Sequence, residues 1–208
     1  MIIAFSGPDG SGKTTLAKIL VKRLLSKNIK ASYIKFGSHH LAMYLLLCLL
    51  RKLKIVSNIE SPRILLYDLK KYFSKSKIFI YLELINAVIW LLVNVKLRRH
   101  LTKRIIVADR YIPDFIVSML LLNPNVCLFK QLTRILRPFM SSTTIIFLYA
   151  SVDDLLSRKK NEVLSPQYIT SMLRLYVLVI STMNINLHLN TSKSKAHDIL
   201  EFIESLLI

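Results

Sequence analysis

Glycine is scarce in this chain, which has only four glycines among 208 residues. Three of the four fall within six positions, in the stretch SGPDGSGKTT near the amino terminus. Glycine is used where a backbone must turn tightly or let a ligand approach closely. The sequence therefore predicts one specialised loop, placed between an apolar run and a leucine- and lysine-rich segment.

Cysteine is scarce as well, and the two residues, Cys48 and Cys127, form no CxxC pair. Their apolar surroundings favour buried free thiols over metal or redox chemistry, which indicates a reducing compartment. No basic leader or small-residue cleavage site precedes the first apolar run, so no signal peptide is visible. We therefore expect a cytoplasmic protein.

Acidic residues are few too: 12 of them face 30 lysines and arginines, for a formal net charge of +18. Such a surface attracts anions, which include nucleotides, nucleic acids and acidic lipids. Hydrophobic residues make up 53% of the chain, and the run 78–95 has the length of a short membrane span. Because Glu83, Asn86 and Asn94 interrupt it, we expect a buried helix or a subunit interface rather than a membrane contact.

Five apolar stretches alternate with helical patterns along the whole chain. Strands are expected at 1–6, 31–36, 104–110, 143–151 and 185–190. Helices are expected at 14–28, 41–53, 78–95, from 113 to a break at 123–125, from there to Pro138, from 152, at 166–182 and at 193–207. This order predicts an α/β three-layer sandwich, in which helices cover both faces of a five-stranded parallel sheet. No repeat or linker divides the chain, so residues 1–208 are expected to form a single domain. Such sheets bind ligands beyond the carboxyl ends of their strands.

The glycine-rich loop matches the pattern G-x-x-x-x-G-K-[ST] in full, from Gly7 to Thr14. The expected strand before it and helix after it are the context that this phosphate-binding loop, the P-loop of NTPases, requires. Lys13 is predicted to contact the β and γ phosphates of ATP, and the Thr14 hydroxyl to hold Mg²⁺. The predicted ATP-binding residues are Gly7, Asp9, Gly10, Ser11, Gly12, Lys13, Thr14 and Thr15.

A second motif is expected at the end of the strand 104–110, where Asp109, Arg110 and Tyr111 follow one another. A GTPase would carry an N-K-x-D base-reading string, which the chain lacks. An acid followed directly by a cation suits a second substrate that is itself a phosphate. Asp109 would orient Mg²⁺ through water, and Arg110 would grip the acceptor phosphate with its fork of donors. The alternative is a purely structural ion pair, and Tyr111 is expected to line the pocket.

With GPDGSGKTT and ADRY placed in this way, the chain resembles the thymidylate kinase family of P-loop nucleoside monophosphate kinases. The resemblance implies that Asp9 lies near the acceptor sugar or the reacting phosphates and that Arg110 holds the monophosphate. It implies a short lid around 153–165 whose arginine would be Arg158, helped by Lys159 and Lys160. It also implies a homodimer, for which the apolar helix 78–95 is the candidate surface.

The family's arginines on the acceptor side are not matched, since neither KFGSH at 35–39 nor the stretch 81–89 contains one. The expected activity is ATP- and Mg²⁺-dependent phosphoryl transfer to a nucleoside monophosphate, with dTMP as the leading acceptor. The catalytic candidates are Asp9, Lys13, Arg110 and Arg158. Two alternatives stay open: a nucleotide-binding protein whose basic surface binds nucleic acid, and a kinase acting on a polynucleotide end or another phosphorylated acceptor.

Overall fold

The computed structural model describes residues 1–36, 76–158, 165–185 and 187–206. In chain order, the described elements are β1 (Ile2–Ser6), α1 (Lys13–Ser26), β2 (Ala31–Lys35), α4 (Lys77–Leu91), the π-helical turn η1 (Leu92–Leu97), α5 (Arg98–Thr102), β3 (Ile105–Asp109), α6 (Ile112–Leu122), α7 (Val126–Leu136), the 3-10 turn η2 (Arg137–Phe139), β4 (Thr143–Tyr149), α8 (Val152–Arg158), α9 (Pro166–Met183), β5 (Leu187–Asn190) and α10 (Ala196–Ser205). The helix predicted at 41–53 and the lid residues 159–164 lie outside the described ranges.

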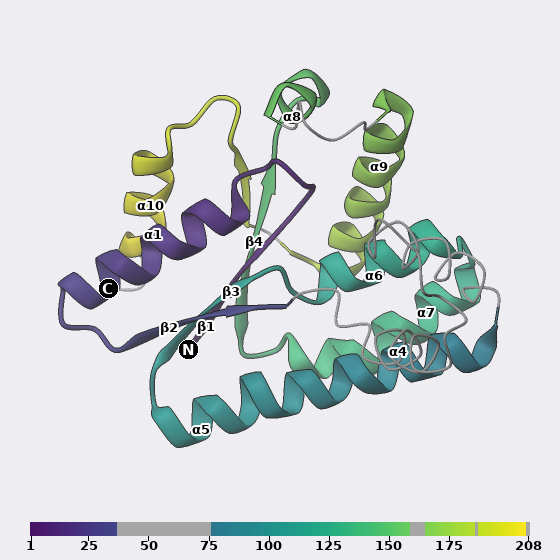
Figure 1. The fold of residues 1–208 in the computed structure, drawn as a ribbon, viewed down its shortest axis with the longest axis horizontal. Coiled ribbons are helices and arrows are strands. Elements are labelled where there is room, and N and C mark those ends of the chain that lie inside the picture. Colours follow the sequence, from purple (N-terminus) through teal and green to yellow (C-terminus); the bar gives the residue numbers. More distant parts are fainter. Residues whose placement is uncertain (37–75, 159–164, 186, 207–208) are drawn as a thin grey trace, which may run out of the picture.

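The sheet has five parallel strands in the order β2-β3-β1-β4-β5, as predicted from the alternation of strands and helices (Figure 1). β1 is the central strand, where Ala4 lies opposite Ala108 of β3 and Ile145 of β4. The chain therefore crosses over β1 between β3 and β4. The loops that follow these three neighbouring strands meet at one edge of the sheet, which is where an open parallel sheet binds its ligand.

Side chains alternate between the two faces of each strand, and each face is buried by its own helices. Ile3 and Phe5 of β1 pack with α1 and α10, whereas Ile2 and Ala4 belong to the larger cluster that α4, α6, α7 and α9 complete. Figure 1 shows α1 and α10 together on one side of the sheet. The fold is thus the three-layer sandwich that the sequence predicts.

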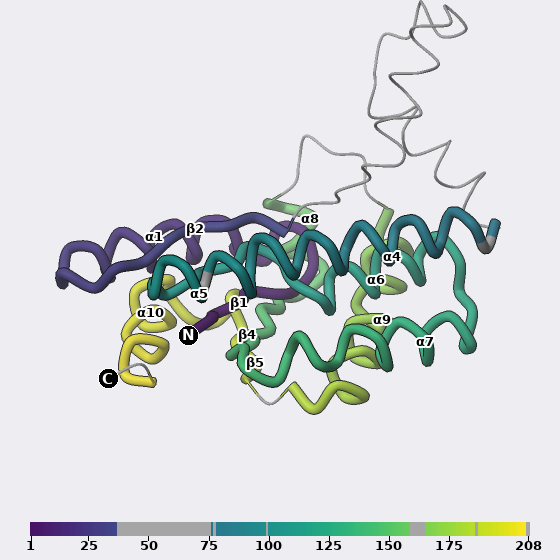
Figure 2. The backbone as a smooth tube through the Cα atoms, turned by 90° about the horizontal axis from the view of Figure 1, so that it is seen from below, coloured from purple at the N-terminus to yellow at the C-terminus, as the bar shows by residue number. Residues whose placement is uncertain are grey.

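The longest apolar helix follows one flank of the molecule, where α4, η1 and α5 form a continuous path in Figure 2. Residues Ile78–Thr102 are long and apolar enough to cross a membrane by length and composition, although 33% of their most apolar window is buried. Leu84, Leu91 and Val95 face the core. The opposite side carries an apolar stripe, with exposed fractions of 42–73%, which consists of Ile78, Tyr81, Leu82, Ile85, Ile89, Leu92, Val93, Leu97 and Leu101.

Two expectations are corrected at the level of the fold. Of the two alternatives for the helix at 78–95, full burial was wrong, because only one side of the helix faces the core; its helical path extends to Thr102, and the subunit interface stays a prediction. Cys127 is exposed, so the prediction of a buried thiol was wrong for this residue. It lies in the first turn of α7, whose core-facing side is formed by Leu128, Leu132 and Leu136. Cys48 lies outside the described residues.

Candidate functional site

The glycine-rich loop leaves β1 at Ser6 and enters α1 at Lys13. Gly7 has a φ of 144°, and a Cβ atom added there would lie 2.0 Å from the Leu148 carbonyl oxygen of β4, so no other residue fits. Gly10 and Gly12 have φ values of 90° and 89°, a region that side-chain-bearing residues rarely adopt. The three glycines thus let the loop pass close to β4 and curl back to deliver the amino end of α1, which attracts anions.

Lys13 is buried at the start of α1, with 4% of its surface exposed. Its Nζ donates hydrogen bonds to the carbonyl oxygens of Gly7, at 2.7 Å, and Pro8, at 2.6 Å. Burial lowers the pKa of the Lys13 ammonium group, and the charge of Asp114 is the largest influence that raises it again. A buried ammonium group held by loop carbonyls can exchange those contacts for phosphate oxygens without leaving the loop.

Asp109 ends β3 directly beneath the loop and is fully buried. Its Oδ2 accepts hydrogen bonds from the hydroxyls of Thr14, at 2.7 Å, and Tyr33, at 2.8 Å. Burial and the hydrogen bond to Asp109 raise the pKa of Tyr33 above its usual value, so its hydroxyl stays a donor. Sequence reasoning missed Tyr33 because a tyrosine in a predicted strand carries no signal of what it faces.

The Asp109–Thr14 pair fits a magnesium ion. Within the described part of the chain, the buried Oδ1 of Asp109 has no hydrogen-bond partner. Mg²⁺ prefers oxygen ligands and keeps several waters, so a carboxylate, a hydroxyl and substrate phosphates are sufficient to bind it. The described residues contain no cluster of three or more His, Cys, Asp or Glu side chains that could hold a metal ion. Mg²⁺ bound by one carboxylate, one hydroxyl and substrate phosphates does not need such a cluster.

Arg110 follows Asp109 in a backbone conformation that is unusual for a residue with a side chain, with a φ of 69°. Its amide donates to the Phe5 carbonyl oxygen at 2.9 Å, which fixes this conformation against β1. The guanidinium group forms an ion pair with Asp9 of the loop. Burial alone would lower the pKa of Arg110, but Asp9 and Asp114 together raise it, so the group stays charged. The predicted cation therefore faces the loop across the cleft.

Arg158, at the carboxyl end of α8, reaches the opposite side of the loop. One of its nitrogens lies 3.2 Å from the Gly10 carbonyl oxygen, and another lies 2.9 Å from that of Thr191, just beyond β5. The loop, Arg110 and Arg158 surround an open cavity of about 530 Å³. Its lining residues are Asp9, Gly10, Ser11, Gly12, Lys13, Thr14, Thr15, Leu16, Arg110, Arg158, Thr191, Ser194, Ala196 and Ile199.

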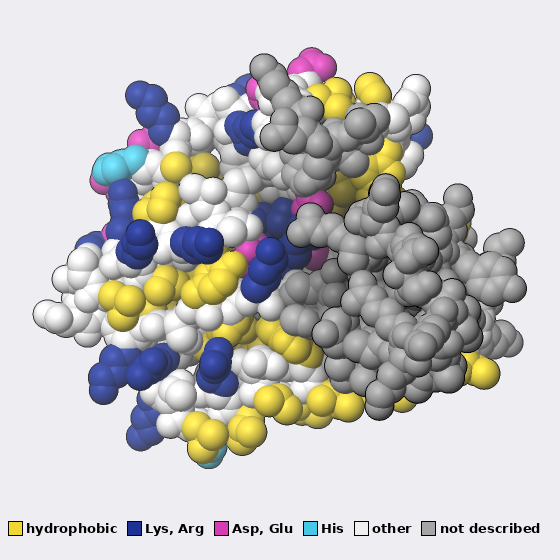
Figure 3. All heavy atoms as spheres, in the orientation of Figure 1, with side chains coloured by type: hydrophobic (Ala, Val, Ile, Leu, Met, Phe, Trp, Pro, Cys, Tyr) yellow, Lys and Arg dark blue, Asp and Glu magenta, His cyan; other side chains and the backbone are white. Residues whose placement is uncertain are grey.

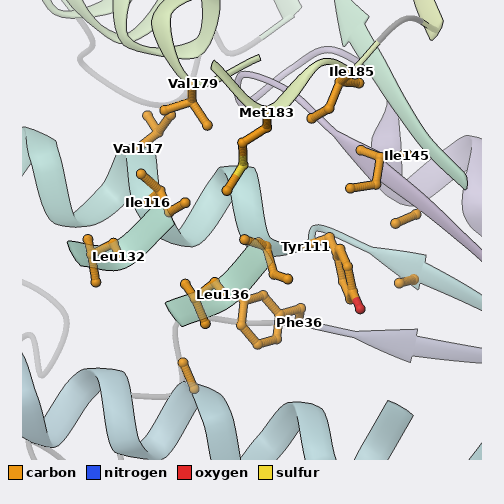
Figure 4. Close-up of a cluster of buried hydrophobic side chains, with 14 of the residues drawn as sticks. Phe36, Tyr111, Ile116, Val117, Leu132, Leu136, Ile145, Val179, Met183 and Ile185 are labelled. Atoms are coloured by element: carbon orange, nitrogen blue, oxygen red, sulfur yellow. The ribbon is translucent and has the colours of Figure 1, made fainter. Parts of the chain in front are cut away.

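Tyr111 does not line this cavity, so its predicted place in the pocket was wrong. The side chain is fully buried, and its hydroxyl donates to the Phe139 carbonyl oxygen at 3.0 Å. Figure 4 shows it in the apolar cluster beside Phe36. The Tyr111 side chain is therefore directed into the core, away from the loop.

Sequence reasoning also missed Asp114, in the first turn of α6. It is 6% exposed, and its carboxylate accepts hydrogen bonds from the amides of Gly7 and Tyr111 and from the hydroxyls of Ser6 and Tyr176. An acid in a first helical turn reads as an ordinary cap. Its contacts with β1 and α9 join residues as many as 108 positions apart, which no local pattern reveals.

The surface around the site is strongly basic. Figure 3 shows lysine and arginine side chains over α1 and near α5, whereas acidic side chains are few on this face. This distribution agrees with the formal charge of +18 and favours negatively charged ligands.

Comparison by sequence finds no matching protein-family model and no matching curated protein. Comparison of structures finds the YorR protein of Bacillus subtilis, solved in complex with phosphorylated GDP, at 18% identity and a TM-score of 0.59, covering 100% of this chain and 95% of that one. The deoxyadenosine kinase of M. mycoides is also similar. With the products dCMP and dCDP it matches at 16% identity and a TM-score of 0.57, covering 100% and 98% of the two chains. With bound dATP it matches at 16% and 0.59, covering 100% and 99%.

The chain has the α/β P-loop NTPase fold. At these identities the likeness concerns the fold, and the nearby folds named above are those of nucleotide-binding proteins and kinases. The arrangement of loop, sheet and helices agrees with the one that the resemblance to nucleoside monophosphate kinases implied.

Proposed function

We propose that this protein is an ATP- and Mg²⁺-dependent kinase that transfers the γ-phosphoryl group to a nucleoside monophosphate, with dTMP as the leading acceptor. The observation that supports this most is the placement of two cations at one cavity: Lys13 inside the P-loop and Arg110 across from it. A simple ATP-binding module needs the first cation only. The second is suited to an acceptor that carries its own negative charge.

In this proposal the loop amides and the amino end of α1 hold the donor phosphates, and Lys13 stabilises the charge on the group being transferred. Mg²⁺, held by the Thr14 hydroxyl and through water by Asp109, would neutralise negative charge on the donor phosphates. Arg158 approaches the loop from α8 and would add a further positive charge. Catalysis is then mainly positioning and charge neutralisation.

The acceptor phosphate would replace Asp9 as the partner of Arg110. The two side chains form an ion pair at the cavity, and both are partly exposed, at 33% and 37%. An incoming phosphate offers the guanidinium two oxygens in a geometry that fits its fork of donors. Asp9 would then be free to face the acceptor. The family resemblance likewise places Asp9 near the acceptor sugar or the reacting phosphates.

A deoxynucleoside acceptor is a second candidate. It is favoured by the similarity to the deoxyadenosine kinase of M. mycoides, whose structure was solved with the product dCMP. In that case the Asp9–Arg110 pair would face a sugar hydroxyl in place of a phosphate.

The direct test is ADP production by the purified protein with Mg²⁺ and ATP across a panel of acceptors. The panel contains dTMP, the other nucleoside monophosphates, the deoxynucleosides, and oligonucleotides with 5′-hydroxyl or 5′-phosphate ends. The proposal expects the largest stimulation with dTMP or another monophosphate. Stimulation by oligonucleotides alone would replace it with a polynucleotide kinase. Salt-sensitive nucleic-acid binding without ADP release would favour a binding module.

A further inference from the structure

A buried carboxylate lies under the entrance of the P-loop and is used by neither proposed substrate. Asp114 belongs to α6, yet the groups that donate hydrogen bonds to it come from three other parts of the fold as well. The Ser6 hydroxyl belongs to β1, the Gly7 amide (3.3 Å) to the loop, and the Tyr176 hydroxyl (2.9 Å) to α9. The Tyr111 amide (3.0 Å) opens α6 itself.

Helix capping accounts for one of these four hydrogen bonds. A carboxylate in the first turn of a helix commonly accepts from a free backbone amide, and the Tyr111 amide fills that role. An exposed capping residue would satisfy its other oxygen with water. Asp114 is buried, and its remaining capacity is given to the end of β1, the start of the loop and a helix from another part of the chain.

The contact with Gly7 fixes the first residue of the P-loop on both sides. The amide of Gly7 is held by Asp114, and its carbonyl oxygen accepts from Lys13 Nζ at 2.7 Å. The direction of this residue decides how the following amides are presented, because Gly7 has a φ of 144° and lies against β4. A loop that binds phosphate through backbone amides depends on their being oriented before the ligand arrives.

We propose that Asp114 is a positioning residue that holds the entrance of the P-loop in its phosphate-binding geometry and, through Tyr176, ties that geometry to α9. This inference rests on the proposed function in one respect, namely that the loop binds the phosphates of ATP. Tyr176 lies within α9 (Pro166–Met183), so the link joins this helix to the base of the loop.

The experiment compares Asp114→Asn with the wild-type protein in fluorescence titrations with mant-ATP, mant-ADP and mant-AMP. An amide places an NH₂ group where only acceptors fit, so at least one of the buried donors loses its partner. We expect binding of mant-ATP and mant-ADP to weaken by roughly 10- to 100-fold, as expected for a lost hydrogen bond to a charged group. Binding of mant-AMP should stay within about threefold, because the loop backbone and Lys13 hold the β and γ phosphates, which AMP lacks.

Tyr176→Phe is the second variant, because it keeps the carboxylate and removes a single hydroxyl. We expect it to weaken mant-ATP binding by about three- to tenfold and to spare mant-AMP. The matched control is Glu204→Gln, which alters another buried carboxylate, one that bridges α1 and α10 through Arg23 and Lys27 at the far end of α1. It should leave all three affinities unchanged even where it lowers the melting temperature.

The outcomes separate this inference from the function on which it rests. A wild-type protein that binds no adenine nucleotide overturns the proposed function. A wild-type protein that binds mant-ATP, together with an Asp114→Asn variant of equal affinity, overturns the positioning role alone. So does a variant in which the three affinities fall together, or in which only the number of binding sites falls, because a purely structural defect has that signature. If Asp114→Asn does not fold, an unchanged Tyr176→Phe overturns the role, and a selective loss supports it.

Discussion

The carboxyl edge of the sheet contains buried polar side chains, whereas the α4–α5 flank presents exposed apolar ones. At the edge, Asp109 and Asp114 are buried polar groups that receive hydrogen bonds from residues far apart in the sequence. Along the flank, an apolar stripe of nine side chains runs from Ile78 to Leu101 and is exposed. The edge uses few residues in a specific geometry, whereas the flank uses many residues of one kind.

The buried polar contacts at the edge indicate a specific chemical role, whereas the exposed apolar side chains of the flank do not specify what binds to them. A buried carboxylate is costly unless donors satisfy it, so each partner of Asp114 constrains what the site can do. An apolar stripe fits a second copy of the chain, another protein or a membrane equally well by composition. We propose, following the family resemblance, that the chain forms a homodimer through this stripe.

The largest effect is expected at the carboxyl edge of the sheet, from Lys13→Ala. Lys13 contributes the charge inside the loop, so its loss should reduce turnover by at least about 10³-fold, while the fold remains. The measurement is ADP release with the best acceptor from the panel, with circular dichroism as a check on folding. The control is Lys18→Ala, an exposed lysine on the same helix. A turnover number within tenfold of the wild type would remove the loop from the mechanism.

The flank is tested by placing charge in the middle of the stripe, with Ile85→Asp and Ile89→Asp combined. The two side chains are 54% and 53% exposed, so a monomer tolerates the change, but a dimer that buries them does not. We expect the wild type to sediment as a dimer and the variant as a monomer, with turnover per chain retained. Leu25→Asp on α1, at a residue that is 51% exposed, serves as the control. A wild-type protein that sediments as a monomer contradicts the proposal.

A smaller effect is expected at the other end of α1, where Glu204 accepts a hydrogen bond from Lys27. That bond, with the charges of Lys27 and Arg23, lowers the pKa of Glu204 below its ordinary value of 4.5. A lowered pKa in the folded state means that the stabilisation is present above pH 4.5 and is lost as the pH falls through the folded-state value. Glu204→Gln should lower the melting temperature by about 2–4 °C at pH 7.

Thermal melts of Glu204→Gln and the wild type across pH 3–8 check this prediction. The difference between the two proteins should shrink as the medium becomes acidic. A difference that stays constant over the whole range would mean that the charge of Glu204 contributes nothing to stability.

The fold was predictable because the apolar runs of the strands and the periodic patterns of the helices are both local features of the sequence. Five short apolar runs separated by helical patterns specify a parallel sheet, and the ends of the strands found lie within two residues of those expected. The P-loop was predictable because Gly7, Gly10 and Gly12 adopt positive φ angles that residues with side chains rarely adopt. The exposure of the helix at 78–95 was not predictable, because its apolar residues cover too much of its circumference to distinguish a core face from a surface face.

The support of the site was not predictable for a different reason. Tyr33, Asp114 and Tyr176 act through contacts made across the sheet, with partners 62 to 108 positions away. Their residue types are ordinary for a strand, a helix start and a buried helix. The opposite error, made at Tyr111, came from reading adjacency to Arg110 as a shared direction, although neighbouring side chains leave a strand end on different sides.

The central claim is that one cavity binds a triphosphate in the loop and an acceptor phosphate at Arg110. The most direct test is calorimetric titration with a bisubstrate analogue, in which adenosine and thymidine are joined 5′ to 5′ through five phosphates. The account predicts that it binds at least about 30-fold more tightly than ATP, and that Arg110→Ala reduces it to about the affinity of ATP. An analogue that binds the wild type no more tightly than ATP would contradict the account.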